Sequence, residues 1–118
     1  FAIRDSYEIA KSLGIKVERT KMCGGGAKSP LWRKILSNVL NLQVDILAVE
    51  EGPALGGAML AAVGCKKYNS VEEIAQKIIK TKETVEPSEE IAALYDERYN
   101  LYKKIYPSVK ELYVQMKN

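Results

Sequence analysis

The sequence contains no histidine and only two cysteines, Cys23 and Cys65. Without histidine no Cys/His metal site can form, and the two cysteines are too far apart for a Cys-x-x-Cys motif. We expect both thiols to be reduced and buried, as small apolar residues in a cytoplasmic protein. The longest uncharged run, residues 52–65, is too short and too rich in glycine and alanine to cross a bilayer. The sequence therefore predicts no membrane contact.

A large net charge is also absent, because 18 basic residues are nearly balanced by 15 acidic ones. The 118 residues carry a net charge of +3, and 47% of them are hydrophobic, which is typical of one ordinary globular domain. The basic residues are scattered rather than gathered in a stripe, so nucleic-acid binding is not expected. The chain starts without Met, and helical spacing is already present at its start, in Ile3, Tyr7, Ala10 and Leu13. We expect a piece of a longer protein.

The first half of the chain has the pattern of a βαβ unit. A helix is expected at residues 2–13, ending at Gly14, which is typical of a C′ position. A strand at residues 17–23, a helix at residues 30–41 and a strand at residues 44–49 follow. Because two strands joined by one helix pair in parallel, we expect a right-handed crossover. The apolar face of the crossover helix is expected at Leu31, Trp32, Ile35, Leu36, Val39 and Leu40, with Arg33, Lys34, Ser37 and Asn38 opposite.

Helices dominate the predictions for the second half. Residues 53–64 carry no charge, so this helix is expected to be buried on most sides, with Gly56 and Gly57 explained by close packing or by a hinge. A capping box at residues 70–73 opens a helix to residue 80, and residues 81–86 are expected to be a connector. A long helix to residue 106 should end at Pro107, and a second capping box at residues 108–111 should open a terminal helix. The tyrosines at helical spacing are expected to pack on the core.

A run of three glycines, Gly24 to Gly26, links the first strand to the crossover helix. Ser29 is a good N-cap residue, and Pro30 suits the first helical position. A turn without Cβ atoms lets a ligand lie directly on the backbone, and a helix N-terminus attracts anions. The alternative is a tight turn with no ligand. The run does not fit the Walker A loop or the G-x-G-x-x-G fingerprint, so Lys28 is interpreted as a solvated loop charge.

The segment from Gly24 to Trp32 resembles the C-terminal-domain signature of the FGGY carbohydrate kinases. Residues 52–62 resemble the glycine-alanine helix that follows in that family, and residues 1–5 are similar to the helix that precedes the glycines. Residues 95–107 are similar to the family's tail, so the resemblance covers nearly the whole chain. The three glycines with Ala-Lys-Ser are most similar to the members that act on D-xylulose.

The resemblance implies an α/β fold, namely part of a ribonuclease-H-like, actin-like ATPase lobe with a βαβ unit and surrounding helices. It implies that ATP and Mg²⁺ bind between two lobes and that the sugar binds mainly to the N-terminal lobe. By motif, the nucleotide would lie against the turn residues Gly24, Gly25, Gly26, Ala27 and Ser29. The catalytic aspartate and the metal-binding acids are expected upstream, because no segment here matches the aspartate loop. Asp5, Asp45 and Asp96 are interpreted as surface or end-of-element charges.

The resemblance thus implies the C-terminal part of a cytoplasmic kinase that phosphorylates a pentulose at the expense of ATP. Residues 1–65 would be the nucleotide-binding βαβα core and residues 66–118 a C-terminal helical tail. Residues 1–118 alone are expected to be inactive. Glycerol, gluconate or another sugar as acceptor remains an alternative, as does a non-catalytic actin-like nucleotide-binding domain. The sequence leaves the oligomeric state open, a homodimer included.

Overall fold

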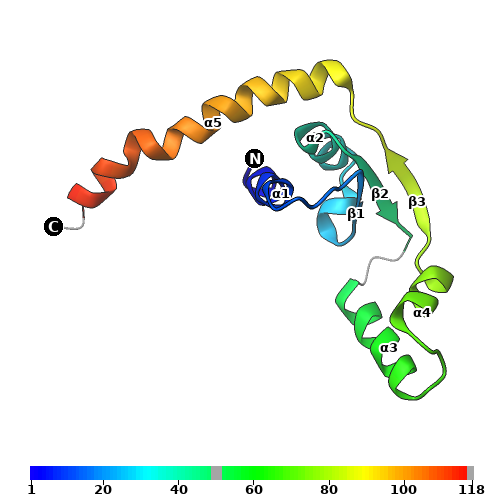
Figure 1. The fold of residues 1–118 in the computed structure, drawn as a ribbon. Helices are drawn as coiled ribbons and strands as arrows, with labels where there is room; N and C mark the ends of the chain where they lie inside the picture. The colour runs from blue at the N-terminus through cyan, green and yellow to red at the C-terminus, as the bar shows by residue number, and fades with distance from the viewer. Residues whose placement is uncertain (49–51, 117–118) are drawn as a thin grey trace.

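The computed structural model describes residues 1–48 and 52–116. Across these residues the elements are α1 (Ala2–Ser12), β1 (Arg19–Met22), the 3-10 helix η1 (Gly25–Lys28), α2 (Pro30–Leu40), β2 (Gln43–Leu47), α3 (Gly52–Gly64), α4 (Val71–Ile78), β3 (Thr81–Val85) and α5 (Glu89–Gln115). Figure 1 shows α1 and α2 on one side of a small sheet, the α3–α4 pair beyond one end of it, and α5 as a long arm that leaves from the other end. The molecule is elongated, with extents of 58 × 41 × 29 Å.

The sheet has the strand order β1-β2-β3. β1 pairs with β2 in parallel, with Met22 opposite Ile46, and α2 is the crossover between them. The predicted βαβ unit is therefore confirmed. Val49, the predicted end of the second strand, lies outside the described residues.

The expected connector at residues 81–86 was wrong, because this segment contains β3. It pairs antiparallel with β2, with Val44 opposite Val85. β3 is an edge strand with almost all of its residues exposed, so it has no apolar alternation that sequence analysis could detect. Residues 66–118 are thus more than a helical tail, since they complete the sheet.

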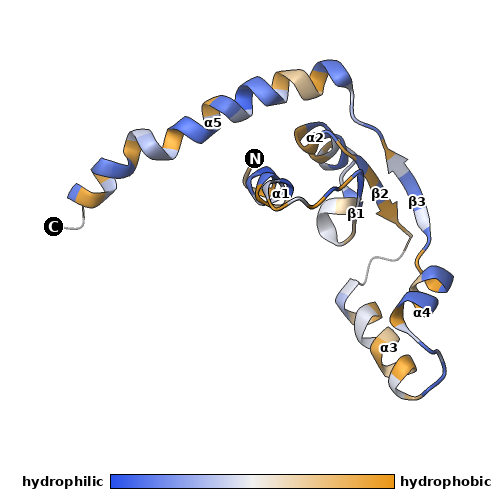
Figure 2. Ribbon diagram, viewed as in Figure 1, coloured by the Kyte–Doolittle hydropathy of each residue, from blue (hydrophilic) through white to orange (hydrophobic). Residues whose placement is uncertain are grey.

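The core lies between the sheet and α2, directly below the glycine turn. Met22, Ala27, Val44 and Ile46 are buried together, and Leu36 is packed against them. Figure 2 shows β2 as the hydrophobic strand of the sheet. The glycine turn therefore rests on a packed base rather than on open solvent.

The N-terminus of α2 is as predicted, and its predicted apolar face is confirmed at Leu36, Val39 and Leu40 but is wrong at other positions. Ser29 caps the helix, because its Oγ accepts a hydrogen bond from the Trp32 backbone N–H at 3.2 Å. Ser37 and Asn38, expected on the polar face, are buried, whereas Trp32 is 43% exposed and Leu31 is exposed too. The polar pair is buried because its hydrogen bonds hold the ends of neighbouring elements. The Ser37 hydroxyl donates to the Leu42 carbonyl, and the Asn38 amide oxygen accepts from the Ser88 N–H.

Asp45 corrects another expectation, since it lies in the middle of β2 and is buried. Its Oδ1 accepts hydrogen bonds from Arg19 and from Thr84, each at 2.7 Å. These bonds, led by that from Arg19, lower the pKa of the Asp45 carboxyl group. The carboxylate is therefore an internal link between all three strands rather than a surface charge.

The expectation that α3 is buried on most sides is wrong within the described part of the chain. No residue of α3 is buried, and Leu60 is 64% exposed. No described atom lies within 4 Å of a Cβ built on Gly56 or Gly57, so the described residues do not supply the expected close packing. The reason is that α3 makes its main contacts with the short helix α4 alone.

The capping box of α4 is present in part. Ser70 Oγ accepts from the Glu73 N–H at 3.2 Å, as predicted. The Glu73 carboxylate, however, accepts from the N–H of Asn69, one residue before the N-cap.

α5 continues through Pro107, where a break was expected. The Ser108 hydroxyl donates to the Lys104 carbonyl instead of capping a new helix. Near the middle of α5, Tyr99 is buried against Phe1 and donates its hydroxyl to Asp5 at 2.7 Å. Burial, and next the Asp5 carboxylate, raise the pKa of Tyr99 to about 12. The expectation that tyrosines pack holds for this residue.

Both cysteines are free, as expected, but both are exposed rather than buried. Cys23 follows the last residue of β1, and Cys65 follows the last residue of α3. Each cysteine thus lies in a connection between elements and not in the core.

Candidate functional site

The candidate site is the glycine turn between β1 and α2. η1 forms a single tight turn in which the Ala27 N–H donates to the Gly24 carbonyl at 3.1 Å and the Ser29 N–H donates to the Gly26 carbonyl at 3.2 Å. The turn lies just beyond the carboxyl ends of the parallel strands β1 and β2. In open α/β sheets this edge is where ligands bind.

Gly24 is required by its backbone conformation. Its φ of 76° and ψ of −167° belong to a region that is essentially restricted to glycine. This residue therefore sets the sharp exit from β1.

Gly26 is favoured by packing. A Cβ at this position would lie 3.0 Å from Cδ1 of Trp32 and 3.2 Å from Cε of Met22. The indole is thus behind the turn, on the side of the core.

Gly25 is required by neither condition within the described residues. No described atom lies within 4 Å of a Cβ built on it, its φ is not in the left-handed region, and it is exposed. An alanine would fit here without strain or collision. The absence of a side chain at Gly25 leaves its backbone accessible to a molecule from outside.

The other two predicted site residues differ in their accessibility. The Ala27 side chain is in the core and only 7% exposed, so it can offer a ligand no more than its backbone. Ser29 is exposed at the N-terminus of α2, where its hydroxyl is used as the helix cap. The structure thus brings all five predicted residues into one turn.

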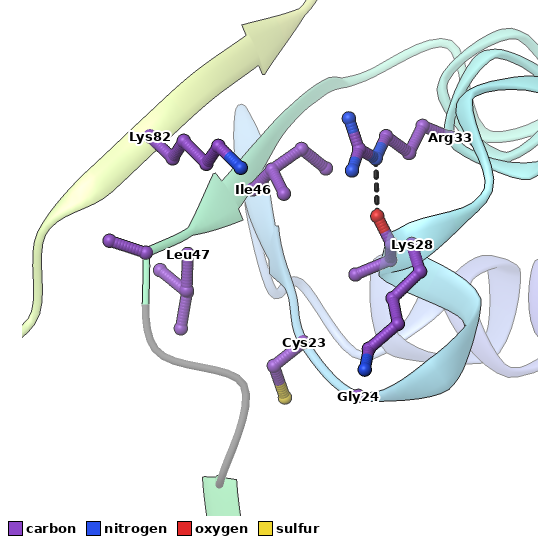
Figure 3. Close-up of a pocket in the computed structure, with 9 residues that line it drawn as sticks. Cys23, Gly24, Lys28, Arg33, Ile46, Leu47 and Lys82 are labelled. Atoms are coloured by element: carbon purple, nitrogen blue, oxygen red, sulfur yellow. Dashed lines mark hydrogen bonds between the residues drawn. The ribbon is translucent and has the colours of Figure 1, made fainter.

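A small cavity of about 50 Å³ opens beside the turn. It is lined by Cys23, Gly24, Ala27, Lys28, Arg33, Ile46, Leu47, Ala48 and Lys82. Figure 3 shows Arg33 and Lys82 reaching toward Ile46 from opposite sides. The volume fits a small group and is well below the ~300 Å³ or more of a typical pocket for a whole small molecule. A larger ligand would place only one end here.

Sequence reasoning missed Arg33 and Lys82 as site residues. Arg33 lies in the first turn of α2, the helix that follows the glycines, and this position was a usable sequence signal for a site residue. Lys82 could not have been found, because it reaches the site only through the pairing of β3 with β2. The lining is positively charged and would attract an anion.

Among residues 1–48 and 52–116, no three His, Cys, Asp or Glu side chains are grouped so that they could hold a metal ion. In the same part of the chain no helix has the length and hydropathy needed to cross a membrane.

Comparisons with known proteins point in one direction. The C-terminal domain of the FGGY family of carbohydrate kinases matches residues 1–65. The xylulose kinase of Staphylococcus epidermidis is 35% identical over 112 residues, which are 95% of this chain and 23% of that protein. An autoinducer-2 kinase of an Enterobacter species is 34% identical over 99 residues, which are 84% of this chain and 19% of that protein.

A solved structure shows the same fold. The ligand-bound xylulose kinase of Lactobacillus acidophilus superposes with a TM-score of 0.81 at 22% identity, over 97% of this chain and 24% of that one. The predicted α/β fold, a part of an actin-like lobe, is confirmed. The chain spans about a quarter or less of the length of these relatives.

Proposed function

Since the chain belongs to the FGGY family of carbohydrate kinases, we propose that it is the C-terminal, nucleotide-binding part of an ATP-dependent sugar kinase. The reaction is transfer of the γ-phosphoryl group of ATP to a hydroxyl group of a pentulose, D-xylulose. The observation that carries the nucleotide role is Gly25, the glycine that the described fold itself does not require.

The physical arrangement of the turn supports ATP as the ligand. The exposed backbone of Gly25 offers a flat surface on which a planar or extended ligand can lie in contact. The N-terminus of α2 and the side chains of Lys28, Arg33 and Lys82 provide positive potential beside it. Adenosine would lie over Gly25 and Ser29, and the phosphates would extend toward the charged cavity.

The contribution of this chain is positioning and electrostatic. Phosphoryl transfer needs aligned reactants and neutralised charge more than covalent chemistry by the protein. Mg²⁺, when bound to ATP, supplies part of that neutralisation. The described residues do not fit a metal site of their own, so we assign the metal-binding carboxylates and the general base to other segments of the kinase.

The choice of D-xylulose rests on the relatives. The Staphylococcus epidermidis relative is a xylulose kinase, whereas the Enterobacter relative, matched at a similar identity, is an autoinducer-2 kinase. The resemblance assigns the acceptor to the other lobe, so another sugar is the alternative within this class.

The test is Gly25→Val in the complete kinase. We expect the KM for ATP to rise by about tenfold or more, equivalent to ~1.4 kcal/mol of lost binding, because the isopropyl group occupies the surface on which the nucleotide lies. The KM for the sugar should change little, and thermal stability should be retained because the new side chain meets open space.

Gly64→Val is the matched control. Gly64 also faces open space and also lacks a left-handed backbone, but it lies at the end of α3. We expect it to leave the KM for ATP unchanged. A Gly25→Val enzyme with normal ATP kinetics would remove the nucleotide role from the turn.

A further inference from the structure

Arg33 connects the glycine turn to the far strand of the sheet. Its Nε donates to the carbonyl oxygen of Ala27, the third residue of η1. Its Nη1 lies 2.7 Å from Oε2 of Glu83 on β3. Figure 3 shows the bond from the guanidinium group to the turn. One side chain on α2 therefore holds two elements that are not adjacent in sequence.

The glycine turn is held by two hydrogen bonds of its own and by the buried Ala27 side chain, and Arg33 adds a side-chain anchor to these. A 3-10 helix has poor hydrogen-bond geometry, and its last carbonyl groups have no N–H partner within the helix itself. Gly25 has no side chain and no described neighbour that would restrain it. The Arg33 side chain is only 15% exposed, and its bond to Ala27 is partly buried, whereas its ion pair with the 49% exposed Glu83 lies at the surface.

We propose that Arg33 is a positioning residue for nucleotide binding: clamped by Glu83, it fixes the glycine turn in the conformation that receives the adenosine part of ATP. This inference rests on the proposed function and adds to it a residue outside the glycine motif. Arginine suits the role because its rigid, planar guanidinium group directs two N–H groups to two partners in fixed directions, whereas a lysine ammonium is a single rotatable charge.

A competing role for Arg33 is direct contact with a phosphate group, since it also lines the cavity. The two roles differ in which ligands they affect. Loss of a phosphate contact would weaken the binding of ADP and ATP but not that of adenosine. Loss of the fixed turn conformation would raise the dissociation constants of all three ligands by the same factor.

The experiment measures the Kd of adenosine and of ADP by calorimetry on the complete kinase and on its Arg33→Lys and Glu83→Ala variants. For Arg33→Lys we expect both dissociation constants to rise by the same factor of about ten, or ~1.4 kcal/mol, while the KM for the sugar is unchanged. A rise for ADP alone, no rise for either ligand, or an equal loss of sugar affinity would overturn the proposal.

Glu83→Ala separates positioning from charge. Glu83 is 49% exposed and does not line the cavity. Removing its negative charge should tighten ADP binding if only electrostatics mattered. The proposal predicts the opposite sign, namely weaker binding of both adenosine and ADP.

Arg19→Lys is the matched control, because Arg19 forms an ion pair with Asp45 on the same sheet but does not touch the turn. It should leave both dissociation constants unchanged, and a change equal to that of Arg33→Lys would count against the clamp. Gly25→Val, measured alongside, tests the proposed function separately. If Gly25→Val weakens nucleotide binding and Arg33→Lys does not, the clamp fails and the nucleotide site stands; if neither does, both fail.

Discussion

Asp45 illustrates how a single carboxylate can hold a three-stranded sheet. It is buried in the central strand and accepts from a side chain of each neighbouring strand, Arg19 on β1 and Thr84 on β3. Charge-assisted hydrogen bonds of this kind stabilise the ionised form of the acid. The pKa of Asp45 is accordingly lowered, with the bond from Arg19 as its largest cause.

This pKa shift predicts a loss of stability in acid. A carboxyl group whose pKa is lower in the folded state stabilises the fold above its unfolded pKa of about 3.9, and this contribution disappears as the pH falls through the folded pKa. We expect Asp45→Asn to be less stable than the wild type at neutral pH and the gap to shrink below about pH 4. Urea unfolding of both proteins at neutral pH and below about pH 4 measures this difference in the free energy of unfolding.

Arg19→Gln provides the companion variant, because it leaves the acid in place and removes its main partner. Its free energy of unfolding should also fall less between neutral and acidic pH than that of the wild type. An Asp45→Asn variant with the same stability gap at both pH values would contradict the role of this carboxylate.

At the residue scale, the sequence predicted the place of the turn but not the separate reasons for its glycines. Gly24 is explained by a dihedral angle and Gly26 by the position of the Trp32 indole, and neither can be read from three identical letters. Lys82 was missed because it reaches the site only through the pairing of β3 with β2, whereas Arg33 lies in the first turn of the helix after the glycines and was overlooked.

At the scale of elements, the local capping signals of α1, α2 and α4 were informative, whereas the signal at Ser108 failed. Ser29 and Ser70 cap their helices as predicted, and Gly14 ends α1 in the left-handed region with φ of 83°. The errors arose where tertiary context overrides local chemistry. β3 forms because the edge of β2 offers hydrogen bonds, and α5 continues through Pro107 although the proline removes one N–H from a helix of 27 residues.

The cap of α2 yields an element-scale prediction. Ser29→Ala should lower stability by about 1 kcal/mol, because a helix N–H loses its acceptor. It should also raise the KM for ATP in the complete kinase, since α2 begins at the proposed nucleotide site. Thermal denaturation and ATP kinetics check the two parts.

Ser70→Ala is the control for this prediction. It removes an equivalent cap from α4 and should lower stability by a similar amount without affecting ATP kinetics. An equal rise in the KM for ATP in both variants would show that the effect comes from lost stability alone.

At the scale of the whole molecule, much apolar surface is exposed on the described helices. It includes Ile9 and Leu13 on or next to α1, Leu60 on α3, and Leu101, Ile105 and Leu112 on α5. Figure 2 shows the hydrophobic character of α3. The chain spans a quarter or less of the length of its relatives, and apolar surface of this extent is what we expect if, as proposed, the chain works as one part of a larger kinase.

This view predicts that the 118-residue chain by itself has no kinase activity. No segment matches the family's aspartate loop, so we expect neither a general base nor a sugar pocket in it. Incubation of the purified chain with D-xylulose and labelled ATP should yield no phosphorylated sugar. Catalytic turnover above the uncatalysed background would contradict the division of labour proposed above.

The most direct test of the central claim is a crystal structure of the complete kinase with ADP bound. The account predicts that the nucleotide makes van der Waals contact, within about 4 Å, with the backbone of Gly25 and lies over the N-terminus of α2. An ADP molecule seated elsewhere, with the Gly25 backbone open to solvent, would contradict it.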